Sequence, residues 1–143
     1  MKFYIATDHA AYKIKSSVID ILEDLGCEVV DLGPENSDRV DYPDFAHKLC
    51  FEVLKDEGSY GILICGTGIG MSLAANKHKG IRAALCHDAY TAQMAREHND
   101  ANIICFGERV VGMGVIESIL KTFIESEFEG GRHENRVNKI EIE

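Results

Sequence analysis

Several reactive side chains in this sequence follow short apolar segments, at the points where strands would end. Asp8 and His9 follow the apolar segment 3–6, Cys65 ends the segment 61–65, and Arg109 comes soon after the segment 102–106. In an open parallel sheet, ligands bind beyond the carboxyl ends of the strands. We therefore expect these side chains to surround one ligand site.

The segment 65–70 reads Cys-Gly-Thr-Gly-Ile-Gly, and its glycines let the backbone approach a ligand closely. Backbone amides at the start of the following helix favour an anion. The segment is not a dinucleotide-binding fingerprint, because Met71 stands where the third glycine is required and the segment follows the third strand rather than the first. We expect an anionic ligand to meet the residues Gly66, Thr67, Gly68, Ile69 and Gly70.

Cys65 has two interpretations. It could be a small buried hydrophobic residue, as Cys86 and Cys105 at other strand ends could be. Alternatively, its place before a helix N-terminus would favour the thiolate through the helix dipole and free amides, which makes it a competent base or nucleophile.

His98 and the charged C-terminal segment also have two interpretations each. His98 could cap the end of a helix, or it could transfer protons near neutral pH. Arg132 and Arg136 are four residues apart, so on a helix their guanidinium groups would share one face and, with Arg109, could hold a phosphate. The same segment could instead be a solvated terminal helix.

Hydrophobic periodicity predicts the elements that must position these residues. Apolar runs at 2–6, 28–32, 62–65, 81–86 and 102–106 are typical of strands, and amphipathic or small-residue helical patterns follow them. Strands that alternate with helices indicate a parallel sheet covered on both faces. We expect one Rossmann-like α/β domain over 1–143, a three-layer sandwich with a five-stranded parallel sheet, and a C-terminal tail over 130–143.

Composition restricts the class of protein. The length of 143 residues and 45% hydrophobic content suit one core, and no apolar run approaches the roughly 20 residues of a membrane helix. A formal charge of −9 argues against nucleic-acid or membrane binding. Five cysteines without CxxC spacing indicate a reducing compartment, the cytoplasm, and six histidines without HxH or HExxH spacing give no reason to expect a metal.

An ordered set of motifs over nearly the whole chain resembles the RpiB/LacAB family of sugar-phosphate isomerases, in particular ribose-5-phosphate isomerase B. The motifs are Thr7-Asp-His-Ala10, Asp41-Tyr-Pro43, Cys65-Gly-Thr-Gly-Ile-Gly70, Ala74-Ala-Asn-Lys77, His98-Asn-Asp100, Phe106-Gly-Glu-Arg109 and Gly130-Gly-Arg-His133. The resemblance implies an aldose–ketose isomerase of the non-oxidative pentose phosphate pathway that interconverts ribose 5-phosphate and ribulose 5-phosphate without a metal or organic cofactor. It also implies a homodimer, or a dimer of such dimers, with active sites at the subunit interface.

The resemblance further implies a role for each site residue. Cys65 would remove the proton beside the carbonyl, Thr67 and the amides of 66–70 would stabilise the enediolate, and His98 would open the furanose ring. Asp8 would assist at the ring oxygens, and Asn99 would hold a sugar hydroxyl. The phosphate end would be held by His9, Arg109, Arg132 and Arg136.

Two positions refine this expectation. Some members of the family use a glutamate as base at the position of Met71, and a methionine cannot act as a base, so this chain resembles the cysteine-dependent branch. Tyr42 could border the sugar or pack beneath the turn at Pro43.

Two alternatives stay open. The first is an isomerase for a six-carbon sugar phosphate, such as allose 6-phosphate or galactose 6-phosphate, since pocket length is not visible in the sequence. The second is a non-catalytic phosphosugar sensor, which would need neither the thiolate nor the ring-opening histidine.

Overall fold

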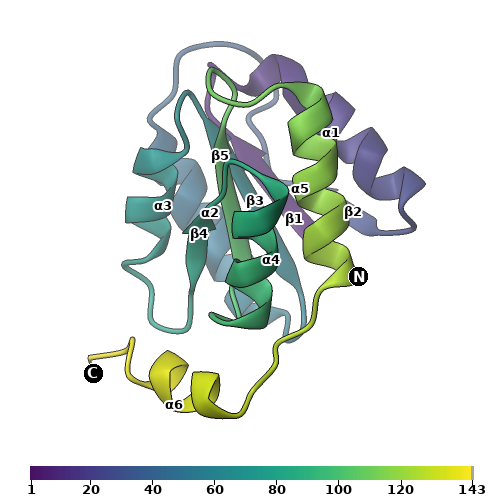
Figure 1. Ribbon diagram of the computed structural model, residues 1–143. Coiled ribbons are helices and arrows are strands. Elements are labelled where there is room, and N and C mark those ends of the chain that lie inside the picture. The colour runs from purple at the N-terminus through teal and green to yellow at the C-terminus, as the bar shows by residue number, and fades with distance from the viewer. Residues whose placement is uncertain (143) are drawn as a thin grey trace.

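The computed structural model describes residues 1–142 and contains a five-stranded parallel sheet between two layers of helices (Figure 1). The expected α/β sandwich is therefore confirmed. The strands are β1 (Lys2–Thr7), β2 (Glu28–Asp31), β3 (Tyr60–Cys65), β4 (Ala83–Leu85) and β5 (Ile103–Gly107). The helices are α1 (Tyr12–Asp24), α2 (Tyr42–Lys55), α3 (Ile69–Ala75), α4 (Ala89–Glu97), α5 (Met113–Glu125) and α6 (Arg132–Asn138).

The strand order is β2-β1-β3-β5-β4, and every pairing is parallel. The central strands β1, β3 and β5 are almost wholly buried, as expected of strands covered on both faces. One apolar core lies between the sheet and α1, α4 and α5, and a second lies between the sheet and α2 and α3.

Strand β4 is shorter than the sequence predicts. The apolar run begins at Ile81, but the amide of Arg82 donates to the side chain of Asn102 at 2.8 Å, and the amide of Ala83 donates to the side chain of Asn76 at 2.8 Å. At the start of this strand, side-chain amide oxygens thus accept the hydrogen bonds that carbonyl oxygens of a neighbouring strand would otherwise accept.

Helix α6 lies beyond the ends of the other helices, at the bottom of Figure 1, below α4. The backbone amide of Glu129 donates to the carbonyl oxygen of Glu97 at 3.0 Å, which holds the segment before α6 against the end of α4. This contact decides which end of the molecule carries the arginines of the tail.

Candidate active site

The first group of predicted site residues lies where the connections after β1 and β3 leave the sheet toward opposite faces. Helix α1, after β1, packs into one core, whereas α3, after β3, packs into the other. Such a switch point leaves a crevice at the carboxyl ends of the two strands. Asp8, His9 and Cys65 all lie at this edge, and the amide of Asp8 donates to the carbonyl of Ile64 at 3.1 Å.

Cys65 ends β3 and is almost fully buried, with 5% of its surface exposed. The amide of Gly68 donates to its Sγ at 3.1 Å, and Gly68 adopts a left-handed conformation, with φ of +80°, that turns the chain into α3. An N–H aimed at the sulfur stabilises a thiolate. The turn therefore supports a base at Cys65.

Other cysteines have an environment that keeps the thiol protonated. Burial raises the pKa of Cys86 to about 11 and that of Cys50 to about 12, and it raises the pKa of Cys105 well above its ordinary value. The interpretation as inert core thiols therefore suits these three cysteines.

The loop after β5 packs directly against the glycine-rich turn. The amide of Glu108 donates to the carbonyl of Cys65 at 2.9 Å, and the amide of Arg109 donates to the carbonyl of Gly66 at 3.0 Å. A Cβ at Gly107 would lie 2.5 Å from Cα of Thr67, so only glycine allows this approach. Gly107 had no predicted role, although its motif was part of the resemblance.

Backbone contacts orient Asp8 and His9. One carboxylate oxygen of Asp8 accepts from the amide of Ala11 at 3.1 Å, and Nδ1 of His9 accepts from the amide of Val40 at 3.2 Å. Because Nδ1 of His9 is occupied, Nε2 is the nitrogen available to a ligand.

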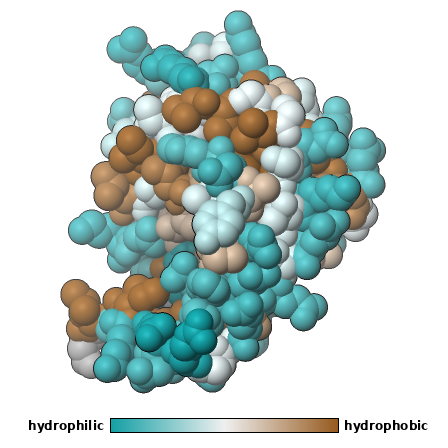
Figure 2. Space-filling view, in the orientation of Figure 1, coloured by the Kyte–Doolittle hydropathy of each residue, from teal (hydrophilic) through white to brown (hydrophobic). Residues whose placement is uncertain are grey.

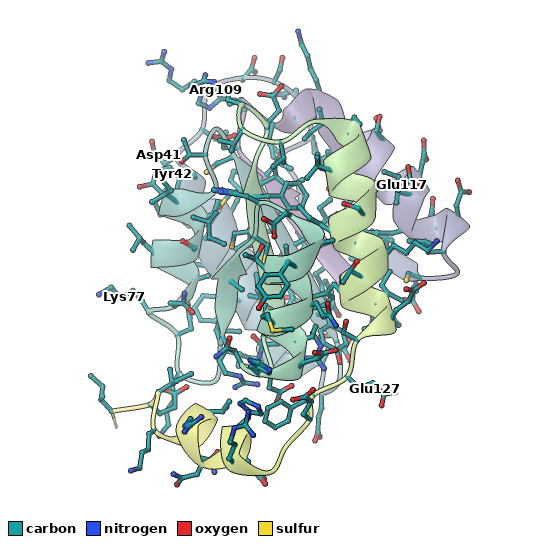
Figure 3. The ribbon with its side chains drawn as sticks, in the orientation of Figure 1. Asp41, Tyr42, Lys77, Arg109, Glu117 and Glu127 are labelled. Atoms are coloured by element: carbon teal, nitrogen blue, oxygen red, sulfur yellow. The ribbon has the colours of Figure 1, made fainter. Side chains whose placement is uncertain are left out.

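Tyr42, at the start of α2, lies against Gly70 of the turn. A Cβ at Gly70 would come within 2.4 Å of the Tyr42 ring, while 40% of the tyrosine remains exposed. Figure 3 shows Tyr42 beside α3 and Arg109 above it. The ring therefore packs on the glycine-rich turn, and whether Tyr42 borders the sugar or packs beneath the turn at Pro43 stays a prediction. Met71, one residue further, is fully buried and offers no carboxylate.

The second group of predicted residues lies at the opposite end of the sheet. Helix α4 begins after the carboxyl end of β4 and runs back, so that its C-cap, His98, and the exposed Asn99 lie near the amino end of β5. Strand β5 is about 13 Å long at 3.3 Å per residue. Arg132 and Arg136 on α6 are exposed at this same end.

The structure therefore divides the predicted site within one chain. Cys65, Asp8, His9, Tyr42, the turn 66–70 and Arg109 lie at one end, and His98, Asn99, Arg132 and Arg136 lie at the other. A sugar phosphate at Cys65 cannot also contact His98 of the same chain. The roles of all these residues remain predictions.

The end of α4 also brings together three potential metal ligands that the sequence analysis did not group. Within residues 1–142, ligand atoms of His98, Glu129 and His133 lie within 4.8 Å of one another. The resemblance contained His133, but its spacing to His98 in the sequence is too long to indicate contact.

None of the helices in residues 1–142 is long and apolar enough to cross a membrane.

Comparison with known proteins settles the family. The profile described as Ribose/Galactose Isomerase matches residues 3–140. The chain belongs to the ribose/galactose isomerase family. It is 43% identical over 139 residues to ribose-5-phosphate isomerase B of Escherichia coli, with 97% of this chain and 93% of that protein covered. It is 49% identical over 138 residues to a probable ribose-5-phosphate isomerase B of Mycoplasma pneumoniae, with 96% and 91% covered.

Solved structures of the family have the same fold. Ribose-5-phosphate isomerase B of Clostridium thermocellum superposes with a TM-score of 0.94 at 51% identity and covers 98% of this chain and 95% of its own. The type B enzyme of Trypanosoma brucei superposes with a TM-score of 0.94 at 48% identity, with 97% and 95% covered. This family member is therefore an aldose–ketose isomerase.

Proposed function

We propose that this isomerase interconverts ribose 5-phosphate and ribulose 5-phosphate. The single observation that carries the proposal is the turn after β3, where the buried Cys65 receives an N–H from Gly68 at 3.1 Å. A base of this kind, next to donors for developing negative charge, suits proton transfer between adjacent sugar carbons.

The proposed chemistry is a proton transfer through an enediolate. The Cys65 thiolate removes the proton from C2 of the open-chain aldose, and the electron pair moves to the carbonyl oxygen. Thr67 and the amides of the turn stabilise the resulting oxyanion. The Cys65 thiol then returns a proton to C1 as the C2 carbonyl forms, and the proton on O2 passes to O1, directly or through solvent, which leaves the ketose.

The divided site supports a homodimer in which each active site takes residues from two subunits. Cys65, Asp8, His9 and Arg109 of one subunit would face His98, Asn99, Arg132 and Arg136 of the second copy. Exposed apolar side chains for such an interface are present on α3, where Ile69 is 50% and Leu73 64% exposed. Figure 2 shows apolar surface over α3 and over the C-terminal segment.

Within that dimer, the two subunits contribute different steps of the reaction. Cys65 carries out the proton transfer, and His98 of the second copy opens the furanose ring. The phosphate is held by His9 and Arg109 of the first subunit together with Arg132 and Arg136 of the second. All five cysteines are free thiols, which supports the cytoplasm as the compartment.

The first experiment is isomerisation of ribose 5-phosphate by the purified protein in the presence of a chelator, with allose 6-phosphate and galactose 6-phosphate assayed in parallel. Turnover of the pentose alone is expected. Turnover of a hexose alone would keep the mechanism and change the substrate. Binding of sugar phosphate without turnover of any substrate would assign the protein as a sensor.

A second experiment tests the base. Cys65→Ala should leave a folded protein that still binds ribose 5-phosphate and has lost isomerisation, because the change removes the base and leaves the anion contacts. Wild-type turnover in this variant would refute the mechanism.

A mixed-dimer experiment tests the shared site. Cys65→Ala and His98→Gln homodimers should each be impaired, because every site contains one altered residue. After subunit exchange, each mixed dimer has one site with both residues intact, so an equal mixture should regain about a quarter of wild-type activity. No recovery, with mixed dimers demonstrated by mass spectrometry, would show that no site combines Cys65 of one subunit with His98 of the other.

A further inference from the structure

The contact between His98 and the segment before α6 is a stacked pair of imidazoles beside a carboxylate. The rings of His98 and His133 lie 4.2 Å apart between centroids, with 12° between their planes. Oε1 of Glu129 lies 3.4 Å from Nε2 of His133 and 3.7 Å from Nε2 of His98. One carboxylate oxygen therefore faces both rings.

His133 is the buried member of the cluster. Its side chain is 10% exposed, whereas that of His98 is 38% exposed and that of Glu129 is 51% exposed. The backbone of Glu129 is held to the end of α4 by its amide bond to Glu97 at 3.0 Å, and the amide of His133 donates to Gly130 at 3.0 Å. The half-exposed face of His98 is thus open to a ligand, while its other face rests on a buried ring.

A bound divalent cation fits this cluster less well. Imidazole nitrogens bind a metal in the plane of the ring, and one ion cannot lie near both planes when the rings are stacked at 12°. Arg132 and Arg136 also place positive charge near His133, which opposes a cation.

We propose that Glu129 and His133 are positioning residues for His98: the buried His133 ring fixes the plane of the His98 imidazole, and the Glu129 carboxylate, which faces the Nε2 atoms of both rings, orients that imidazole within its plane. This inference rests on the proposed ring-opening role of His98. It gives a function to Glu129 and His133, to which neither the family resemblance nor the proposed phosphate contacts assign one.

The charge state of the stack favours this arrangement. Partial burial, followed by the proximity of His98 and Arg132, lowers the pKa of His133. The Glu129 carboxylate lies beside both rings, so it supplies negative charge next to the imidazole that transfers a proton during ring opening.

The test separates ring opening from proton transfer. Ribulose 5-phosphate cannot form a furanose, because its C5 oxygen carries the phosphate, so exchange of its C1 hydrogen with solvent deuterium needs only the base. Isomerisation of ribose 5-phosphate needs the ring to open as well. Both reactions are measured on the full-length protein, the first by NMR and the second by ketose formation.

Four variants define the contribution of each group. Glu129→Gln keeps the size of the side chain and removes its charge, His133→Phe keeps a flat ring without nitrogens, and His133→Ala removes the platform. Glu127→Gln is the matched control, since Glu127 is an exposed glutamate of the same segment that points away from the molecule in Figure 3.

Glu129→Gln should lower kcat for ribose 5-phosphate about tenfold or more, with KM changed less than about twofold and deuterium exchange as in the wild type. His133→Phe should retain more of the isomerisation rate than His133→Ala. Glu127→Gln should behave as wild type in both assays.

Three results would overturn the proposal. The first is equal kcat in Glu129→Gln and Glu127→Gln. The second is a parallel fall of isomerisation and exchange, which would indicate a general structural disturbance. The third is activity that requires added Zn²⁺ and is lost in chelator, which would assign the cluster to a metal. A wild-type protein inactive on ribose 5-phosphate would instead refute the proposed function.

Discussion

The turn beneath Cys65 depends on a glycine at position 68, and Gly68→Ala is the sharpest test of how the fold supports the base. Gly68 has a φ of +80°, and a Cβ there would lie 2.7 Å from the Leu85 side chain, 2.7 Å from the carbonyl carbon of Phe106 and 2.9 Å from its Cα. Two of these three contacts are with buried backbone of the central strand β5, which cannot move aside.

Gly58 provides a matched control because its φ is +85° and nothing lies within 4 Å of its Cβ position. An alanine in this left-handed region costs about 1 kcal/mol at either position. Overpacking adds roughly 1–3 kcal/mol at Gly68 alone. We therefore expect the free energy of unfolding of Gly68→Ala to be about 2 kcal/mol lower than that of Gly58→Ala. At an m-value of about 2 kcal/mol/M, this difference lowers the urea midpoint by about 1 M.

Activity should fall more than stability alone explains. A displaced Gly68 amide no longer donates to Sγ of Cys65. Loss of a hydrogen bond to a charged group, about 1.5–3 kcal/mol, should lower kcat roughly tenfold or more. Gly58→Ala should keep wild-type kcat at temperatures where it is folded. Equal urea midpoints for the two variants, or wild-type kcat in Gly68→Ala, would refute this account of the turn.

Three further predictions concern other parts of the chain. Asp100, with φ of +48°, contacts the buried Arg96 at 2.9 Å, so Asp100→Ala should cost about 2–3 kcal/mol in urea unfolding and Asp100→Asn less, because Asn tolerates this conformation. Equal losses of stability in the two variants would contradict the argument from the positive φ of Asp100. Burial, and after it the proximity of His47, lowers the pKa of His78 in the folded protein. The contribution of His78 to stability is therefore fully present above the pKa of histidine in the unfolded chain, and it is lost as the pH falls through the lower pKa of the folded protein. His78→Gln should therefore show a shallower decline between about pH 7 and 5, and an unchanged slope would exclude His78 as the source. Arg136→Ala should raise KM for ribose 5-phosphate roughly tenfold or more with little change in kcat, because one charge-assisted contact to the phosphate is lost. An unchanged KM would favour the alternative interpretation of the tail as a solvated helix.

Local sequence was enough to predict the sheet, its parallel strands and the placement of Cys65 before a helix. Each of these features follows from short-range patterns: apolar runs of four to six residues, glycines at turns, and helical periodicity between them. The boundaries of β4 were not predictable in this way, because the first backbone amides of the run donate to the side chains of Asn76 and Asn102, which belong to other segments of the chain.

The chemistry of the turn was partly readable from sequence. The spacing Cys65-Gly-Thr-Gly indicated amides near a sulfur, since both lie within three residues of each other. The requirement for glycine at Gly107 was not readable, because it arises from contact with Thr67 on another strand connection.

The sequence by itself determined the residue types, the order of strands and helices along the chain, and the family. Only the tertiary structure decided which residues meet. Because α4 runs antiparallel to the strands, it carries His98 to the end of the sheet opposite Cys65, and the Glu129 contact carries the tail arginines there too. Residues that are far apart in the sequence thus become neighbours, or lie at opposite ends of the sheet, through the direction of one helix, which no local pattern records.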